Sequence, residues 1–165
     1  MEGLAMKRIV FCMILAGFGT GPAVASSSTT IENFQLQHCL APVSSTSGAF
    51  VELQSCTGAE IQLWQYEHMR YSHLRLRNKA TNMCLDLQTA SGADGIRAIQ
   101  RPCSTNQTQR WHFNSTYNHY PEDSLKITSL TNVFSEKCLA IQTGVGTVYQ
   151  WNCNGKTDQR WWSWP

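Results

Sequence analysis

Short stretches of this chain alternate apolar and polar residues with a period of two, which is typical of β-strands with one buried face. The clearest stretch covers residues 73–78, passes a turn-like segment at 79–82 and continues as Met83–Leu87. Residues 125–130 and 137–141 show the same order of strand, turn and strand. No amphipathic helical pattern occurs between them. We therefore predict an all-β chain.

The motif Gln-x-Trp occurs three times and divides the chain into a threefold repeat. Each motif tryptophan follows a cysteine by eight residues, and the three tryptophans lie 47 and 50 residues apart. The motifs are Gln62-Leu63-Trp64, Gln109-Arg110-Trp111 and Gln159-Arg160-Trp161. A fixed period of this size is typical of a repeat architecture. We predict repeats at about residues 34–66, 73–114 and 125–164, with about four strands in each.

The spacing within Gln-x-Trp has a structural explanation. Residues two apart in a strand share a face, so the glutamine and the tryptophan of each motif point the same way. One four-stranded repeat is too small to cover its own tryptophan, whereas three repeats around a pseudo-threefold axis can bury all three rings. The glutamine amide can then satisfy nearby backbone groups. We expect all six side chains to lie in the core.

Six of the seven cysteines fall in pairs, one pair in each repeat. The pairs are Cys39 and Cys56, Cys84 and Cys103, and Cys138 and Cys153. We predict one disulfide inside each repeat, which implies an oxidising compartment. A zinc site is the competing interpretation, but the sequence has no close Cys-x-x-Cys pair and no cysteine–histidine cluster at ligand spacing.

The first 25 residues have the pattern of a signal peptide. Lys7 and Arg8 precede an apolar run at residues 9–19, and Ala23-Val24-Ala25 has the small-x-small pattern of a cleavage site. The run is too short for a transmembrane helix, and no later segment comes close. We expect a mature single domain at 26–165 that is secreted into the extracellular space or the periplasm.

Charge and residue distribution exclude several classes of function. Lys and Arg number 13 against 11 Asp and Glu, so the formal net charge of +2 gives no general attraction to nucleic acid or anionic membranes. The five histidines are scattered, and the serines lie outside any nucleophile-elbow motif. We expect neither an enzyme nor a cofactor.

Three Gln-x-Trp strands, each behind a cysteine pair opened by Cys-Leu, resemble the ricin B-type lectin family. The resemblance covers about residues 34–164 and implies a β-trefoil: three four-stranded repeats with pseudo-threefold symmetry. It also implies binding of sugars, often galactose-type, in shallow pockets, one possible in each repeat. Members of the family often serve as the targeting part of toxins or glycosidases.

The family's pocket, as the resemblance implies, needs three groups. A carboxylate stands two residues after the first cysteine, an aromatic ring two residues before the second, and a polar residue just before the motif glutamine. The carboxylate accepts hydrogen bonds from sugar hydroxyls and the ring stacks on the sugar's C–H face. The first repeat has Ala41, Gln54 and Ile61 at these positions, so we expect no sugar there.

The second repeat has the carboxylate, Asp86, but Arg101 replaces the ring, and Thr108 precedes Gln109. Arg101 can hydrogen-bond a glycan or a sialic-type carboxylate. It can equally pair with Asp86 as an ordinary ion pair. Both interpretations stay open, and Asp86, Arg101 and Gln109 are candidate carbohydrate-binding residues.

The third repeat has the ring, Trp151, with Tyr149 on the same strand face and Asp158 before Gln159, but Ala140 replaces the carboxylate. Trp151 is the strongest candidate for ligand contact, and Tyr149, Asp158 and Gln159 are further carbohydrate-binding candidates. The alternative for Trp151 is packing against the disulfide of its own repeat.

Two tryptophans near the C-terminus suggest a protein partner. With Trp161 pointing inward, the period of two directs Trp162 and Trp164 outward, where they form an apolar patch or are covered by the chain end. A secreted trefoil with incomplete sugar pockets is similar to the accessory, cell-binding subunits of cytolethal distending toxins. A non-catalytic subunit of a toxin complex is therefore the alternative to a lectin. Protease inhibition is a third option without a distinguishing mark in the sequence.

Overall fold

The structure is a computed structural model that describes residues 28–117 and 127–164. The predicted signal peptide lies outside the described residues. Three consecutive units of four strands make up the described chain. They are β1 Ser28–Asn33, β2 His38–Pro42, β3 Val51–Ser55 and β4 Leu63–His68; β5 Leu74–Asn78, β6 Met83–Leu87, β7 Ala98–Pro102 and β8 Trp111–Tyr117; and β9 Ile127–Asn132, β10 Cys138–Ile141, β11 Val148–Trp151 and β12 Trp161–Trp164. The prediction of four strands in each repeat is confirmed.

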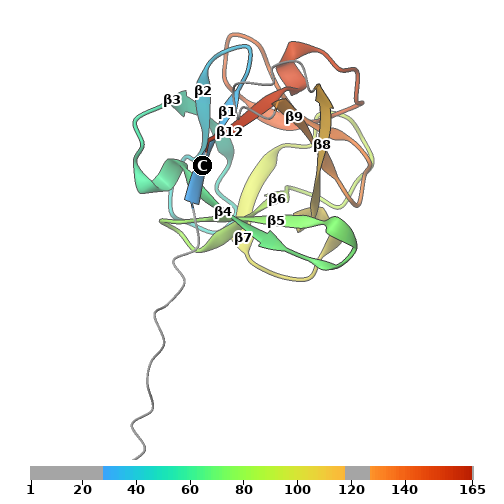
Figure 1. The fold of residues 1–165 in the computed structure, drawn as a ribbon. Helices are drawn as coiled ribbons and strands as arrows, with labels where there is room; N and C mark the ends of the chain where they lie inside the picture. The colour runs from blue at the N-terminus through green and yellow to red at the C-terminus, as the bar shows by residue number, and fades with distance from the viewer. Residues whose placement is uncertain (1–27, 118–126, 165) are drawn as a thin grey trace, which may run out of the picture.

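The first and last strands of the three units form a closed barrel. Strand β1 pairs with β12 and β4, β5 pairs with β4 and β8, and β9 pairs with β8 and β12, all antiparallel. Figure 1 shows the three units as lobes around a common centre, running from blue through green and yellow to red. The fold is a β-trefoil, as predicted. No helix in residues 28–117 or 127–164 is long and apolar enough to cross a membrane.

The middle strands of each unit form a hairpin that branches from the barrel. The hairpins are β2–β3, β6–β7 and β10–β11. One disulfide closes each of them, joining Cys39 to Cys56, Cys84 to Cys103 and Cys138 to Cys153. The predicted pairing is confirmed, and none of these six cysteines is a free thiol. Closing loops of 17, 19 and 15 residues in this way favours the folded state by restricting the unfolded chain.

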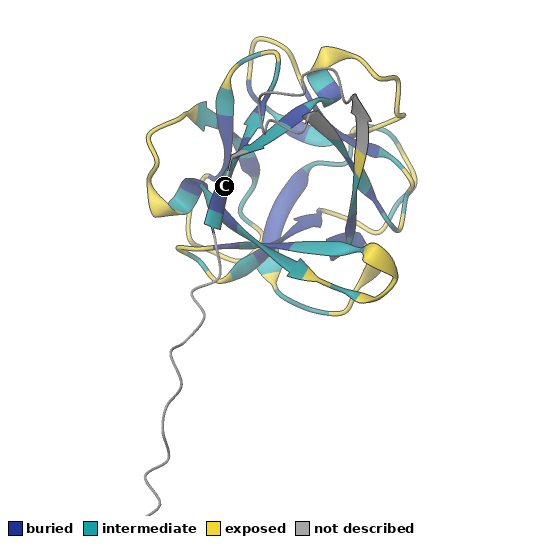
Figure 2. Ribbon diagram, viewed as in Figure 1, coloured by how far each residue is buried: buried dark blue, intermediate teal, exposed yellow. Residues whose placement is uncertain are grey.

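The three motif tryptophans form the centre of the core. Trp64, Trp111 and Trp161 are at most 1% exposed. In Figure 2 the buried segments lie mainly on the strands, and the exposed segments lie mainly in the outer loops. Each indole N–H donates to the carbonyl of the leucine in the same unit's Cys-Leu pair. The acceptors are Leu40, Leu85 and Leu139, at 2.9, 3.3 and 3.0 Å. The Cys-Leu pair therefore supplies both a disulfide and the hydrogen-bond partner that a buried indole needs.

The motif glutamines anchor the loop that follows each second cysteine. Gln62 accepts from the backbone N–H of Thr57 at 2.8 Å and donates to the carbonyl of Ser55 at 2.8 Å. Gln109 and Gln159 accept from loop N–H groups in the same way. All three are at most 2% exposed. The structural role predicted for the glutamines is confirmed.

A second set of buried amides was not predicted. Asn33, Asn78 and Asn132 end the first strand of each unit, are 0% exposed and donate to backbone carbonyls near the motif glutamines. Their side-chain oxygens accept from N–H groups of the turn that follows. Each lies six residues before the first cysteine of its unit. This spacing was the sequence signal that could have identified them.

The contact between the third unit's hairpin loop and the first unit departs from the threefold symmetry. Gln100 donates to carbonyls of the first unit's hairpin loop, and Gln150 does the same to the second unit's loop. The first unit has Leu53 at this position, and the third unit's loop approaches it through Gly146. A Cβ on Gly146 would lie 3.2 Å from the carbonyl oxygen of Leu53, so the close approach requires glycine.

Candidate functional site

Strand register defines two pocket positions that recur in every unit. Gln54, Arg101 and Trp151 each pair directly with the first cysteine of their own hairpin. The residue two before each of them pairs with Ala41, Asp86 or Ala140. The three candidate pockets are therefore geometrically equivalent, and their chemistry differs only through their side chains.

The first unit has no polar pocket at these positions. Ala41 is 0% exposed and the side chain of Gln54 is half-buried. Ile61, before the motif glutamine, offers no hydrogen bond. At these three positions the first unit therefore has neither a carboxylate nor a ring.

The second unit's carboxylate is occupied by protein groups. Asp86 is 1% exposed, and its two oxygens accept from the Leu87 N–H at 2.7 Å and from Gln109 Nε2 at 3.0 Å. Arg101 Nη1 lies 3.6 Å from Asp86 Oδ2. The Arg101 guanidinium also donates to the carbonyls of Leu87 and Gln88, at 3.2 and 2.9 Å. This geometry favours the ion pair over a sugar contact, although the outward edge of Arg101 stays accessible.

The third unit presents an exposed ring. Trp151 is 43% exposed and stands at the end of β11. Tyr149 meets it edge to face, with ring centroids 5.7 Å apart at 69°. On another side, a Cβ placed on Gly95 of the second unit would lie 3.9 Å from the Trp151 ring. Trp151 is therefore held between two neighbours while part of its ring remains open to a ligand.

A carboxylate lies near this ring pair. Burial raises the pKa of the Tyr149 hydroxyl, and the negative charge of Asp158 raises it further. The hydroxyl donates to the Ile141 carbonyl at 3.2 Å. Asp158 is half-buried, whereas Gln159 is buried and supports the loop through Asn152 and Asn154. The rings of Trp151 and Tyr149 thus meet, the charge of Asp158 acts on the Tyr149 hydroxyl, and Gln159 is a buried scaffold residue.

The second unit contributes Asp94 to the surroundings of Trp151, a contact that the sequence did not predict. Asp94 Oδ1 accepts from Lys137 Nζ at 2.7 Å and from the Asn152 N–H at 2.9 Å. Lys137 also donates to Asn152 Oδ1 at 2.6 Å. These bonds fix the residue that follows Trp151 against a neighbouring loop. No local pattern could have shown this, because the groups come from different units.

The C-terminal tryptophans lie on β12, which pairs with β1. Trp162 is half-buried and stacks on Phe34, with ring centroids 5.5 Å apart at 15°. The side chain of Trp164 lies outside the described part of the chain. The outward direction predicted for Trp162 is compatible with this geometry, but Phe34 covers part of the ring.

Comparisons with known proteins agree with the geometry. Residues 27–161 match the ricin-type beta-trefoil lectin domain. The chain is similar to N-acetylgalactosaminyltransferase 7 of Homo sapiens and of Pongo abelii, with 26% identity over 133 residues. The match covers 79% of this chain and 17% of those proteins, so the chain spans about a sixth of their length.

Solved structures show the same fold. ThreeFoil, a designed threefold-symmetric protein, is 21% identical with a TM-score of 0.75, over 82% of this chain and 96% of that one. The Polyporus squamosus lectin bound to Neu5Acα2-6Galβ1-4GlcNAc is 20% identical with a TM-score of 0.70, over 84% and 48%. A chain of cytolethal distending toxin from Actinobacillus actinomycetemcomitans is 19% identical with a TM-score of 0.65, over 85% and 92%.

Proposed function

The chain belongs to the ricin-type beta-trefoil lectin family, and from this premise we propose that it binds glycans through the pocket of its third unit. The exposed Trp151 ring beside Tyr149 and Asp158 is the observation that carries the proposal. An aromatic face accepts the C–H face of a sugar, and a nearby carboxylate accepts hydrogen bonds from its hydroxyl groups. Galactose-type sugars are the class that we propose, because the family resemblance implies them.

The proposed pocket is shallow, so each contact with a sugar is weak. A hexose of about twelve heavy atoms at ~0.3 kcal/mol per atom gives a dissociation constant of about 2 mM. Recognition of a surface would then depend on several copies of the sugar or of the protein. A multivalent glycan array is therefore a suitable assay.

The proposal is tested by a glycan array with the mature chain, Trp151→Ala and Asp86→Ala. We expect selective binding that Trp151→Ala loses, because the stacking surface is gone. Asp86→Ala is the matched control, since Asp86 is 1% exposed beneath Arg101 and should leave the glycan profile unchanged. An unaltered profile for Trp151→Ala would show that the sugar binds elsewhere.

Ala140→Asp should strengthen binding by restoring the missing carboxylate. Asp86 shows that this backbone position accepts a carboxylate hydrogen-bonded to the motif glutamine. We expect about tenfold tighter binding of galactose or lactose in calorimetric titration, equal to one added charge-assisted hydrogen bond. Ala41→Asp, in the unit without a ring, should bring no gain. Equal gains in both variants would refute the role of Trp151.

The second candidate function is a cell-binding accessory subunit of a secreted toxin complex, without catalytic activity. The stacked Phe34 and Trp162 pair favours it, together with a fold that matches 92% of a cytolethal distending toxin chain. Both functions assume export after removal of residues 1–25, which N-terminal sequencing of the exported protein tests. Co-purification of another secreted polypeptide that depends on Trp162 and Trp164, without glycan binding, would favour the subunit.

A further inference from the structure

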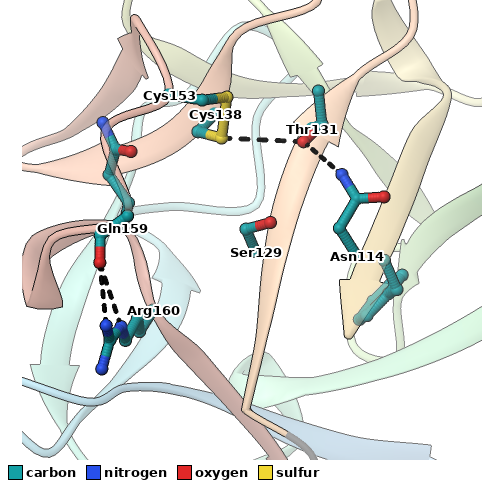
Figure 3. Close-up of a pocket in the computed structure, with 9 residues that line it drawn as sticks. Asn114, Ser129, Thr131, Cys138, Cys153, Gln159 and Arg160 are labelled. Carbon is teal, nitrogen blue, oxygen red and sulfur yellow. Dashed lines mark hydrogen bonds between the residues drawn. A yellow bond between two sulfur atoms is a disulfide. The ribbon is translucent and has the colours of Figure 1, made fainter. Parts of the chain in front are cut away.

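A cleft of about 550 Å³ opens between strands β8 and β9 and the loop that follows Cys153, and Trp151 is not among the residues that line it. Its volume lies within the range of small-molecule sites. Figure 3 shows Asn114 from β8 and Thr131 from β9 pointing toward each other beside the Cys138–Cys153 disulfide. Ser129 lies on the same strand as Thr131.

The junction between the first and second units, where β4 pairs with β5, shows why the cleft exists. Strand register makes the pair Asn114 and Ser129 equivalent to Glu67 and Arg75. In the same way, Thr131 occupies the position of Arg77. Two arginines and a glutamate at the β4–β5 junction are thus replaced at the β8–β9 junction by an amide and two short hydroxyl side chains.

At the junction of β4 from the first unit with β5 from the second unit, these long side chains form an ion network. Glu67 accepts from Arg75 Nε at 2.7 Å and forms a second ion pair with Arg77. Arg75 Nη1 reaches the carbonyl of Ser104, in the loop after the second cysteine, at 2.8 Å. Burial raises the pKa of Glu67, but the hydrogen bonds and charges of the two arginines outweigh it and lower the pKa overall.

At the β8–β9 junction the equivalent surface is a cleft lined by both polar and apolar residues. Asn114 Nδ2 donates to Thr131 Oγ1 at 2.9 Å, which leaves the amide oxygen of Asn114 facing outward from that bond. Phe113 also lines the cleft; it is half-buried, packs against the core and meets the Tyr66 ring edge to face, with ring centroids 5.0 Å apart. Arg160 lines the cleft with its Nε and Nη2 groups donating to the Gly155 carbonyl, at 3.2 and 3.0 Å.

We propose that this cleft is a second saccharide site, for a neutral sugar such as a hexose or an N-acetylhexosamine. Hydroxyl and amide groups next to an aromatic ring and a disulfide match the polar edge and apolar face of a sugar. The two arginines that make the equivalent surface charged are replaced here by Ser129 and Thr131, and Arg160, the one charged residue among those that line the cleft, donates to a carbonyl. These features favour a neutral ligand over an anion.

The cleft is distinct from the pocket proposed above. That pocket is built from β11 and Asp158, whereas the cleft is built from β8, β9 and the far side of the disulfide. Only the buried scaffold residue Gln159 belongs to both. The two sites can therefore be disabled separately.

The test is an amide NMR titration of the mature chain with galactose, N-acetylgalactosamine and, separately, inorganic phosphate. We expect saturable shifts at the Ser129 and Thr131 amides with a sugar, and their persistence in Trp151→Ala. The variant Asn114→Glu/Ser129→Arg/Thr131→Arg copies the ion network of the β4–β5 junction into the same register of the β8–β9 junction. It should weaken binding at the cleft by about tenfold or more and preserve shifts at the Trp151 amide. Ser129→Arg alone is the milder variant if the triple variant does not fold.

Each outcome decides the proposal. Sugar-induced shifts confined to the surroundings of Trp151 would overturn the second site and leave the proposed function intact. Shifts confined to the cleft would support the second site and contradict the pocket assigned to Trp151. Cleft shifts with phosphate but with neither sugar would overturn the assignment of a neutral ligand. No shifts with any probe would overturn both proposals.

Discussion

Trp111→Ala is expected to lower the free energy of unfolding by about 3–5 kcal/mol, the usual cost of truncating a large buried aromatic side chain. Trp111 is 0% exposed in the shared centre of the three units, where the surrounding strands belong to a closed barrel and cannot collapse into the space. The variant also leaves the Leu85 carbonyl without its indole partner, which adds to the cost. Urea unfolding followed by circular dichroism measures the effect.

Trp162→Ala is the matched control for this prediction. Its ring is half-buried and stacks on Phe34 at the barrel surface, so we expect a loss of about 1 kcal/mol. Equal losses for the two variants would contradict a core built around the motif tryptophans. The two single variants are sufficient for the comparison, because Trp111 lies in the centre of the core and Trp162 lies at the barrel surface.

Removing one disulfide should have the second-largest effect. Cys39→Ala/Cys56→Ala opens a loop of 17 residues and is expected to lower the free energy of unfolding by about 2–4 kcal/mol. The cause is the larger conformational freedom of the unfolded chain, together with the loss of packing at the buried Cys39. Thermal unfolding of the variant and of the parent protein, at matched pH, measures the change.

The first unit offers a clean place for this experiment because it holds no candidate pocket. Sugar affinity at a temperature where both proteins are folded should therefore be unchanged. Unfolding the parent protein in reducing buffer should bring its stability down further, since all three bridges open. A stability that does not respond to loss of this bridge would show that the hairpin is held by its other contacts alone.

The repeat and the disulfides were predictable because both follow from a regular spacing of residues within short segments of the sequence. A tryptophan eight residues after a cysteine, with glutamine two positions earlier, specifies a strand face and a loop anchor in one short segment. The asparagines at Asn33, Asn78 and Asn132 share a fixed spacing as well. They were missed because asparagine is common in turns and its burial is visible only in three dimensions.

The site was predictable in part. Trp151, Tyr149 and Asp158 come together because they lie close in sequence on one hairpin and the loop after it. Asp86 and Arg101 also meet. Whether they contact a ligand or form an ion pair depends on their burial and on their other hydrogen-bond partners. Neither property can be predicted from the sequence. The bond between Asp94 and Lys137 and the cleft beside Ser129 depend on how the units dock. Such contacts have no local pattern.

The most direct test of the whole account is the affinity of Trp151→Ala and Trp151→Phe for the best array glycan, measured by calorimetric titration. Stacking on the open ring of the third unit predicts a loss of about tenfold for alanine and a change within about threefold for phenylalanine. Affinity equal to the parent protein in Trp151→Ala, with the same glycan still bound, would contradict the assignment of this pocket.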